Sequence, residues 1–119
     1  MLVRALTSSG GSSGASLETI TVNGSASPTL DVPVNGASNL YFISATLSRG
    51  SVSTNPPTVQ IFYGDGTTPA SNAVSMTTSG TNYNFTASSS NDLTASNKLI
   101  VKINSGSNCT ISGTIKVIK

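Results

Sequence analysis

The sequence contains no histidine, no tryptophan and a single cysteine, Cys109. Without histidine, a serine or cysteine nucleophile lacks its most usual general base. A single cysteine cannot form a disulfide within the chain, so the sequence does not require an oxidising compartment. Its alternation with Ile111, Ile115 and Val117 predicts that Cys109 is a small buried hydrophobic residue.

Charged side chains are also scarce, at 8% of the 119 residues, against about 25% in an average soluble protein. Serine, threonine, asparagine and glycine occupy the surface positions instead, and these residues are poor helix formers. The net charge is only +2, which argues against a nucleic-acid partner. Lys98, Lys102, Lys116 and Lys119 alternate with apolar residues, so we interpret them as outward positions on strands rather than as an anion-binding patch.

The four acidic residues are Glu18, Asp31, Asp65 and Asp92, which lie far apart in the sequence. Nothing in the sequence brings two of them together as glycoside hydrolysis would require. Asp65 lies in a Gly-Asp-Gly segment, but one carboxylate is too few for a typical calcium loop. We expect a plain turn there, in which Asp65 accepts backbone hydrogen bonds. The sequence therefore predicts no enzyme activity, no cofactor and no metal.

Long apolar runs are absent, so the sequence predicts no transmembrane helix and no membrane partner. The first six residues are too few for the apolar part of a signal peptide and are interrupted by Arg4. We therefore expect the chain to be made and assembled in the cytoplasm.

The chain divides into two parts by composition, residues 1–16 and residues 17–119. The first part has a short apolar head followed by a Gly/Ser-rich tract, residues 7–16, whose composition is typical of a flexible linker. We predict that the head binds a partner through Met1, Leu2, Val3, Arg4 and Leu6. The alternative is a frayed terminus. An extended tract of about ten residues would give the head a reach of roughly 30 Å.

The second part shows short apolar runs separated by turn residues, which predicts about eight strands and minimal helix. The fold class is therefore all-β: a single antiparallel β-sandwich, either jelly-roll or immunoglobulin-like, with an extended N-terminal arm. Pro33 marks an edge strand because it cannot donate to a ladder. The predicted strands cover residues 17–22, 29–34, 39–48, 58–63, 73–78, 81–88, 98–103 and 109–118.

An arm of residues 1–16 followed by one Ser/Thr/Asn-rich sandwich of residues 17–119 resembles the capsid decoration (cement) and head-fibre proteins of tailed bacteriophages. The resemblance implies a non-catalytic virion structural protein that decorates and stabilises the outer capsid surface. Its implied partners are the major capsid protein lattice and further copies of itself, often as a homotrimer. Its implied location is the virion, after assembly in the host cytoplasm.

Two other functions stay open. A carbohydrate-binding or tail-fibre module that recognises a surface glycan would need exposed aromatic side chains, for which Tyr41, Tyr63 and Tyr83 are the candidates. Tyr63 and Tyr83 lie at alternating, apolar-matched positions on strands, which favours core packing for them. A self-assembling capsid or pilus-like subunit would use its arm to complete the sheet of a neighbouring copy.

Overall fold

The structure, a computed structural model, describes residues 15–119, and this part of the chain folds into strands without a helix. Alternation of apolar with hydroxyl or amide side chains gives the long strands one buried and one exposed face. The prediction of an all-β chain is confirmed. The strands are β1 (Leu17–Ala26), β2 (Thr29–Pro33), β3 (Asn39–Arg49), β4 (Thr58–Tyr63), β5 (Val74–Ser75), β6 (Tyr83–Thr86), β7 (Thr94–Ala95), β8 (Lys98–Ser105) and β9 (Cys109–Ile118).

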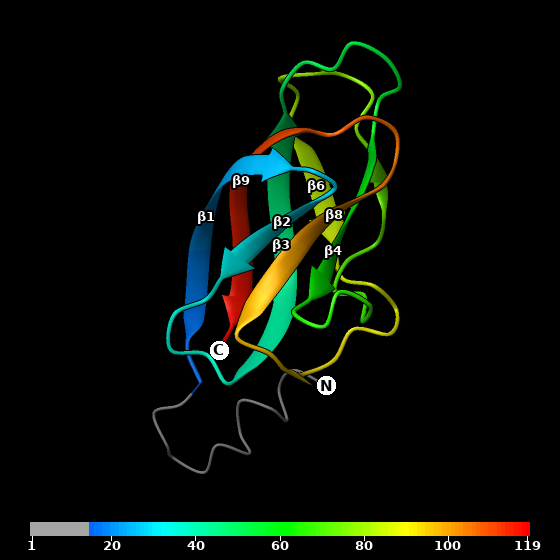
Figure 1. Cartoon of the computed structure of the whole chain (residues 1–119). Helices are drawn as coiled ribbons and strands as arrows, with labels where there is room; N and C mark the ends of the chain where they lie inside the picture. Colours follow the sequence, from blue (N-terminus) through cyan, green and yellow to red (C-terminus); the bar gives the residue numbers. More distant parts are fainter. Residues whose placement is uncertain (1–14) are drawn as a thin grey trace.

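Two antiparallel sheets pack face to face. The first has the order β1-β9-β3-β6, with the short β7 also paired to β3, and the second has the order β2-β8-β4-β5. Figure 1 shows the second sheet in front of the first, with β1 and β2 along the same side of the molecule. The prediction that Pro33 marks an edge strand is confirmed, because β2 forms one edge of its sheet.

The strand pairs are nested along the sequence. β1 pairs with β9, β2 with β8, β3 with β6 and β4 with β5, so that early strands lie beside late ones and middle strands beside each other. Among the described strands, β4 and β5 are the only successive ones that pair with each other. Apart from the β6–β7 connection, the remaining connections carry the chain from one sheet to the other, which ties the two sheets together.

The core lies between the sheets. Its largest fully buried side chains include Phe42 and Leu47 of β3, Ile61 and Tyr63 of β4, and Phe85 of β6. Removing one such side chain from water contributes roughly 1.5–3 kcal/mol to folding. Cys109, Ile111, Ile115 and Val117 are all buried in the same core, as their alternation predicted.

Several strand ends differ from the prediction. The first strand does not stop at Asn23-Gly24 but pairs with β9 as far as Ala26. Gly24 is suited to this strand because a Cβ there would come within 2.8 Å of the Leu30 side chain. The predicted strands over 73–78 and 81–88 shrink to β5 and β6, and β7 was not predicted. These short strands follow loops that carry little apolar alternation.

A β-bulge explains the apolar residues on both faces of β3. The pairing with β9 shifts register between Phe42 and Ser44, which leaves Ile43 as the extra residue. Leu40 and Phe42 therefore share the buried face with Ala45 and Leu47, although their sequence positions differ in parity. Tyr41 and Ile43 are only partly buried.

Candidate interaction surfaces

The acidic residues do not gather into a reactive site. Glu18 pairs with Lys119 at 2.7 Å, and Asp31 pairs with Lys98 at 3.0 Å. Asp65 and Asp92 lie in loops, and neither belongs to these two pairs. Within residues 15–119, no three side chains of the His, Cys, Asp or Glu types lie close enough to hold a metal ion.

Asp65 organises the loop after β4. Its Oδ1 accepts the backbone N–H of Thr67 at 2.9 Å and that of Thr68 at 2.8 Å, and its Oδ2 accepts the Thr68 hydroxyl. These donors, the Thr68 hydroxyl foremost, lower the pKa of Asp65 to about 2. Gly66 supplies the positive φ of 75° that the turn requires. The expectation of a turn held by Asp65 is confirmed.

Tyr63 serves the core and does not offer a sugar-binding surface. The side chain is 1% exposed, and its hydroxyl accepts the backbone N–H of Phe42 at 2.9 Å. The same hydroxyl donates to Oδ1 of Asn91 at 2.5 Å, and Nδ2 of Asn91 donates to the Phe42 carbonyl at 2.9 Å. Tyr63 and Asn91 thus satisfy the N–H and carbonyl of Phe42, which lies between the part of β3 that pairs with β7 and the part that pairs with β6. Burial raises the pKa of Tyr63 to about 12.

Tyr41 and Tyr83 are partly exposed but lie at different ends of β3. Tyr83 pairs with Leu47, six positions along the strand from Tyr41, which corresponds to about 20 Å. The Tyr83 hydroxyl accepts the backbone N–H of Thr78 at 2.9 Å. The two rings therefore cannot stack on one sugar, and the three tyrosines do not form an aromatic platform.

Arg49 has a structural role that the sequence analysis did not identify. Its side chain is buried at the end of β3, where its N–H groups donate to the carbonyls of Met76 at 2.5 Å, Thr77 at 2.9 Å and Gly50 at 2.9 Å. The contacts fasten the chain after β5 to the end of β3. Arg49 continues the inward alternation of Ala45 and Leu47, and this is the signal that could have revealed it.

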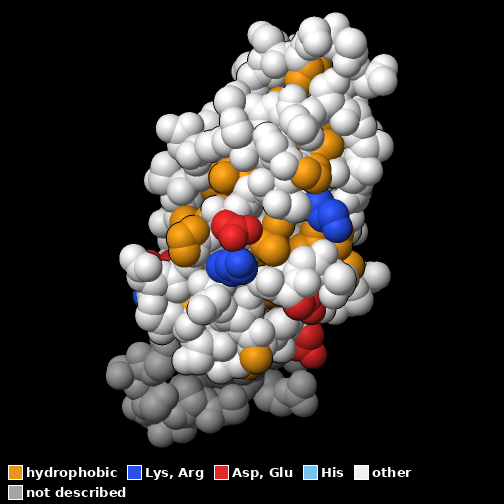
Figure 2. Space-filling model, in the orientation of Figure 1, with side chains coloured by type: hydrophobic (Ala, Val, Ile, Leu, Met, Phe, Trp, Pro, Cys, Tyr) orange, Lys and Arg blue, Asp and Glu red, His pale blue; other side chains and the backbone are white. Residues whose placement is uncertain are grey.

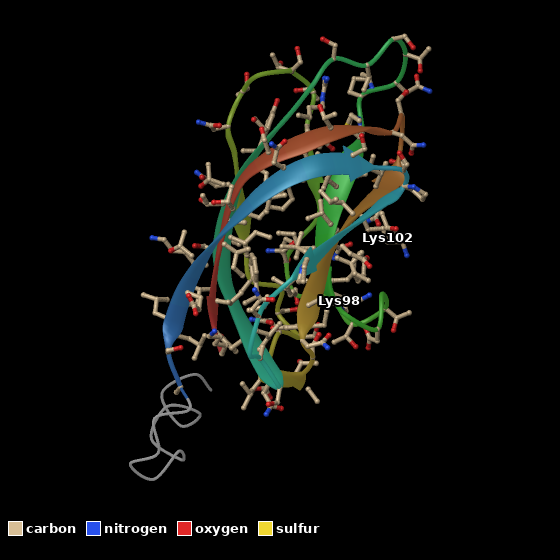
Figure 3. The ribbon with its side chains drawn as sticks, turned by 60° about the vertical axis from the view of Figure 1, so that its left-hand side comes forward. Lys98 and Lys102 are labelled. Atoms are coloured by element: carbon tan, nitrogen blue, oxygen red, sulfur yellow. The ribbon has the colours of Figure 1, made fainter. Side chains whose placement is uncertain are left out.

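Three of the four C-terminal lysines are engaged within the fold. Lys98 and Lys119 form the ion pairs above, and Nζ of Lys102 lies 5.2 Å from the centroid of the Phe62 ring. Figure 3 shows Lys98 and Lys102 projecting from β8 beside β2. Lys116 lies on β9 of the first sheet, apart from Lys98 and Lys102 on the second sheet. The lysines therefore do not converge on one anion-binding patch.

Beyond the end row of Leu17, Ile118 and Tyr41, the outer face of the first sheet carries short neutral polar side chains, and we call this part the hydroxyl face. Backbone pairing aligns its members in rows, such as Thr21, Thr114, Thr46 and Asn84. Lys116 is its only charged member. The face comprises Thr19, Thr21, Asn23, Ser25, Ser44, Thr46, Ser48, Asn84, Thr86, Thr110, Ser112, Thr114 and Lys116. Even on the opposite side of the molecule, Figure 2 shows charged groups only as scattered spots on a mainly neutral surface.

A groove runs along the side of the sandwich, between the edge strands β1 and β2. It consists of two adjoining hollows of about 330 and 250 Å³, which share Ile20, Thr21 and Pro33. Its floor is apolar: Ile20 and Leu30 are partly buried, while Val22 and Val32 belong to the core. Figure 3 looks onto this side of the molecule, with β1 and β2 in front. We call this feature the β1–β2 groove.

The predicted partner-binding residues Met1, Leu2, Val3, Arg4 and Leu6 lie outside the described residues. The described chain starts at Ala15, close to the lower end of the β1–β2 groove. Ser16 exchanges two backbone hydrogen bonds of 2.9 Å with Lys119, and Lys119 also lines the groove. Leu17 follows on β1 and is 63% exposed, the highest value among the large apolar side chains described.

Comparison of the chain with protein-family models, with curated proteins and with solved structures found no match. Residues 15–119 contain no helix of the length and hydropathy needed to cross a membrane.

Proposed function

We propose that this chain is a non-catalytic virion structural protein that decorates and stabilises the outer surface of a phage capsid. In this proposal it assembles in the host cytoplasm and binds the lattice of the major capsid protein as a homo-oligomer, a trimer being the expected form. Residues 1–6 supply an assembly contact, and the hydroxyl face lies on the lattice.

The strand order carries the proposal. Apart from β7, residues 15–119 form eight strands in the orders β1-β9-β3-β6 and β2-β8-β4-β5, and we infer that they form a jelly roll. This order is what results when a long hairpin with nested pairs rolls up into two sheets. Jelly rolls recur in viral capsid domains, although lectin and cupin domains use them too. Fold alone does not fix function, so the support from strand order is an analogy.

The hydroxyl face adds support that belongs to this chain. An almost uncharged surface loses little attraction when salt screens charges, because it has few charges to screen. Its short side chains also lose little rotamer entropy on contact. Many copies that bind the assembled shell but not its free subunits would stabilise the shell by mass action. A decoration protein needs this combination.

A self-assembling capsid or pilus-like subunit is the second candidate. The observation that favours it is the ten-residue edge strand β1, which has only β9 as a partner within the described residues. Its outward side chains are neutral, and it contains neither lysine nor proline, the residues that commonly protect an edge from further pairing. A carbohydrate-binding or tail-fibre module lacks a comparable observation, because the tyrosines do not gather.

Co-sedimentation tests the decoration proposal. The purified chain would be mixed with empty shells of the major capsid protein encoded by the same genome, at low and at high salt. We expect the chain to pellet with the shells at both salt concentrations. Thr114→Glu, which places a charge in the centre of the hydroxyl face, should abolish pelleting, whereas Ser79→Glu in an exposed loop should not. A chain that stays in the supernatant with shells present would refute the proposal.

A further inference from the structure

The β1–β2 groove lies between two strands that each lack a partner on one side. Among the strands of residues 15–119, β1 pairs only with β9, and β2 pairs only with β8. The sole backbone hydrogen bond that joins the end of β1 to β2 is from Ser27 N–H to the Thr29 carbonyl, at 3.3 Å, within the described residues. The open edge of β1 can therefore accept an additional strand, which would pair through its backbone, whereas Pro33 leaves β2 without an N–H at that position.

The groove also has apolar surface for the side chains of such a strand. Ile20 and Leu30 remain partly exposed on its floor, and Leu17 is exposed on the outer side of the same edge. A strand added beside β1 would place alternate side chains over the floor and the others beside Leu17. An occupant with apolar residues on both of its faces fits this arrangement.

The charges around the groove favour an occupant without a fixed acidic or basic pattern. Glu18 is neutralised by Lys119, and Asp31 is neutralised by Lys98. Lys119 additionally donates to the Asn35 carbonyl at 2.7 Å, so it is held across the lower end of the groove. The attraction of the groove is therefore that of apolar surface and unpaired backbone.

Residues 1–6 of the chain, Met-Leu-Val-Arg-Ala-Leu, have the required character. In an extended strand Met1, Val3 and Ala5 lie on one face, and Leu2 and Leu6 lie on the other with Arg4. The first set would lie over the apolar groove floor, and the second would place Leu2 or Leu6 near the exposed Leu17.

The length of the Gly/Ser tract indicates which copy supplies the strand. A return of the chain onto its own edge would need a loop of only about two to five residues. Residues 7–16 can instead span roughly 30 Å when extended, which exceeds the 24 × 23 Å cross-section of the molecule. Ser16 itself is still paired with Lys119, so the tract that is free to span this distance precedes Ser16.

We propose that the β1–β2 groove binds residues 1–6 of a second copy of this chain as an added β-strand. Such an exchange joins copies head to tail. The copies form a closed ring when the rotation from each copy to the next adds up to a full turn, as in a trimer. The inference rests on the proposed function only in treating residues 1–6 as an assembly arm. It assigns that arm to the contact between copies and leaves the hydroxyl face to meet the shell.

The test uses the purified chain without shells, so that its failure is distinct from a failure to decorate. Sedimentation velocity would compare the full chain, a chain that starts at Thr7, and two charge variants of the full chain. We expect the full chain to be oligomeric and the shortened chain to be monomeric. Ile20→Lys on the groove floor should dissociate the oligomer, whereas Asn84→Lys on the opposite edge strand β6 should leave it intact.

A second measurement keeps the test valid if Ile20→Lys fails to fold. A peptide of residues 1–16 would be added to the isotopically labelled shortened chain, and amide shifts would be followed by NMR. We expect shifts at residues 19–23 and 30–32 and none in β5 or β6. A peptide in which Val3 is replaced by Asp should bind much more weakly than one in which Thr7 is replaced by Asp.

Three results would overturn the inference. One is a full chain that stays monomeric over a wide concentration range, whether its arm is free or bound to its own groove. Another is an oligomer that persists after residues 1–6 are removed. The third is a peptide that causes shifts away from β1 and β2, or none at all.

Discussion

At the scale of single residues, Tyr63 has the most consequential polar contact in the core. Its hydroxyl supplies the acceptor for the Phe42 N–H at the bulge of β3. Tyr63→Phe leaves that buried N–H without its partner, so we expect a loss of about 1–3 kcal/mol in the free energy of unfolding. Chemical denaturation measures it. Tyr83→Phe is the control and should cost less, because water can replace its hydroxyl; equal losses would contradict this role of Tyr63.

The same residue gives the fold an alkaline limit. The pKa of Tyr63 is raised by burial to about 12, whereas an unfolded tyrosine titrates near 10. Its contribution to the free energy of unfolding is therefore complete below pH 10 and is lost as pH rises through 12. The melting temperature of the wild type should fall over this interval more steeply than that of Tyr63→Phe. Parallel curves for the two proteins would show that Tyr63 does not carry the effect.

Asp65 has the opposite dependence on pH. Its folded-state pKa is lowered to about 2 by the Thr68 hydroxyl and the backbone donors of its turn, below an unfolded value near 3.9. Its contribution to the free energy of unfolding is present above pH 4 and disappears as pH falls through 2. Asp65→Asn should therefore lower the melting temperature at neutral pH, and the difference from wild type should shrink toward pH 2. A difference that is independent of pH would refute this account.

The turn at Asp65 and the burial of Cys109 and Tyr63 could be predicted from the sequence, whereas the hydrogen bonds of Tyr63 and Arg49 could not. The predictable features depend on near neighbours, namely a turn of a few residues and a simple alternation. Tyr63 and Arg49 obtain their hydrogen-bond partners from segments far away in the chain, Asn91 and Phe42 for one and residues 76–77 for the other. Those partners follow from strand order, which local patterns do not specify.

At the scale of elements, the close packing of β9 against β3 depends on Gly113. It has a φ of 143°, and a Cβ there would collide with the backbone of Thr46 and Leu47. Gly80 also has positive φ, at 74°, but a Cβ there meets nothing within 4 Å. We expect Gly80→Ala to cost about 1–2 kcal/mol and Gly113→Ala to cost about 1–3 kcal/mol more. Similar unfolding free energies for the two variants would contradict the close approach.

The long strands could be predicted from the sequence because alternation continues over their whole length. The predicted bounds of β4 and β9 match the structure, and β2 and β3 differ from prediction by one residue at an end. The end of β1 was missed because Asn23-Gly24 is typical of a turn, yet the ladder with β9 continues through it. β5, β6 and β7 are too short for a pattern to fix their bounds, since their positions depend on the strands they join.

At the scale of the whole molecule, the nested strand order places the hydroxyl face and the β1–β2 groove side by side. The hydroxyl face covers the outside of one sheet, and the β1–β2 groove follows its edge. Neither could be predicted from the sequence, since each combines residues from distant strands. The exposed serines and threonines were recognisable individually, but their alignment in rows depends on the register of β1, β9, β3 and β6.

In the proposed function, the chain sits on the outside of a phage shell. Electron cryomicroscopy of shells incubated with the full chain tests it most directly. The account predicts one sandwich per subunit on the outer surface, grouped around a symmetry axis, with the hydroxyl face against the lattice. Shells whose outer surface shows no added density, at protein concentrations well above the number of lattice sites, would contradict it.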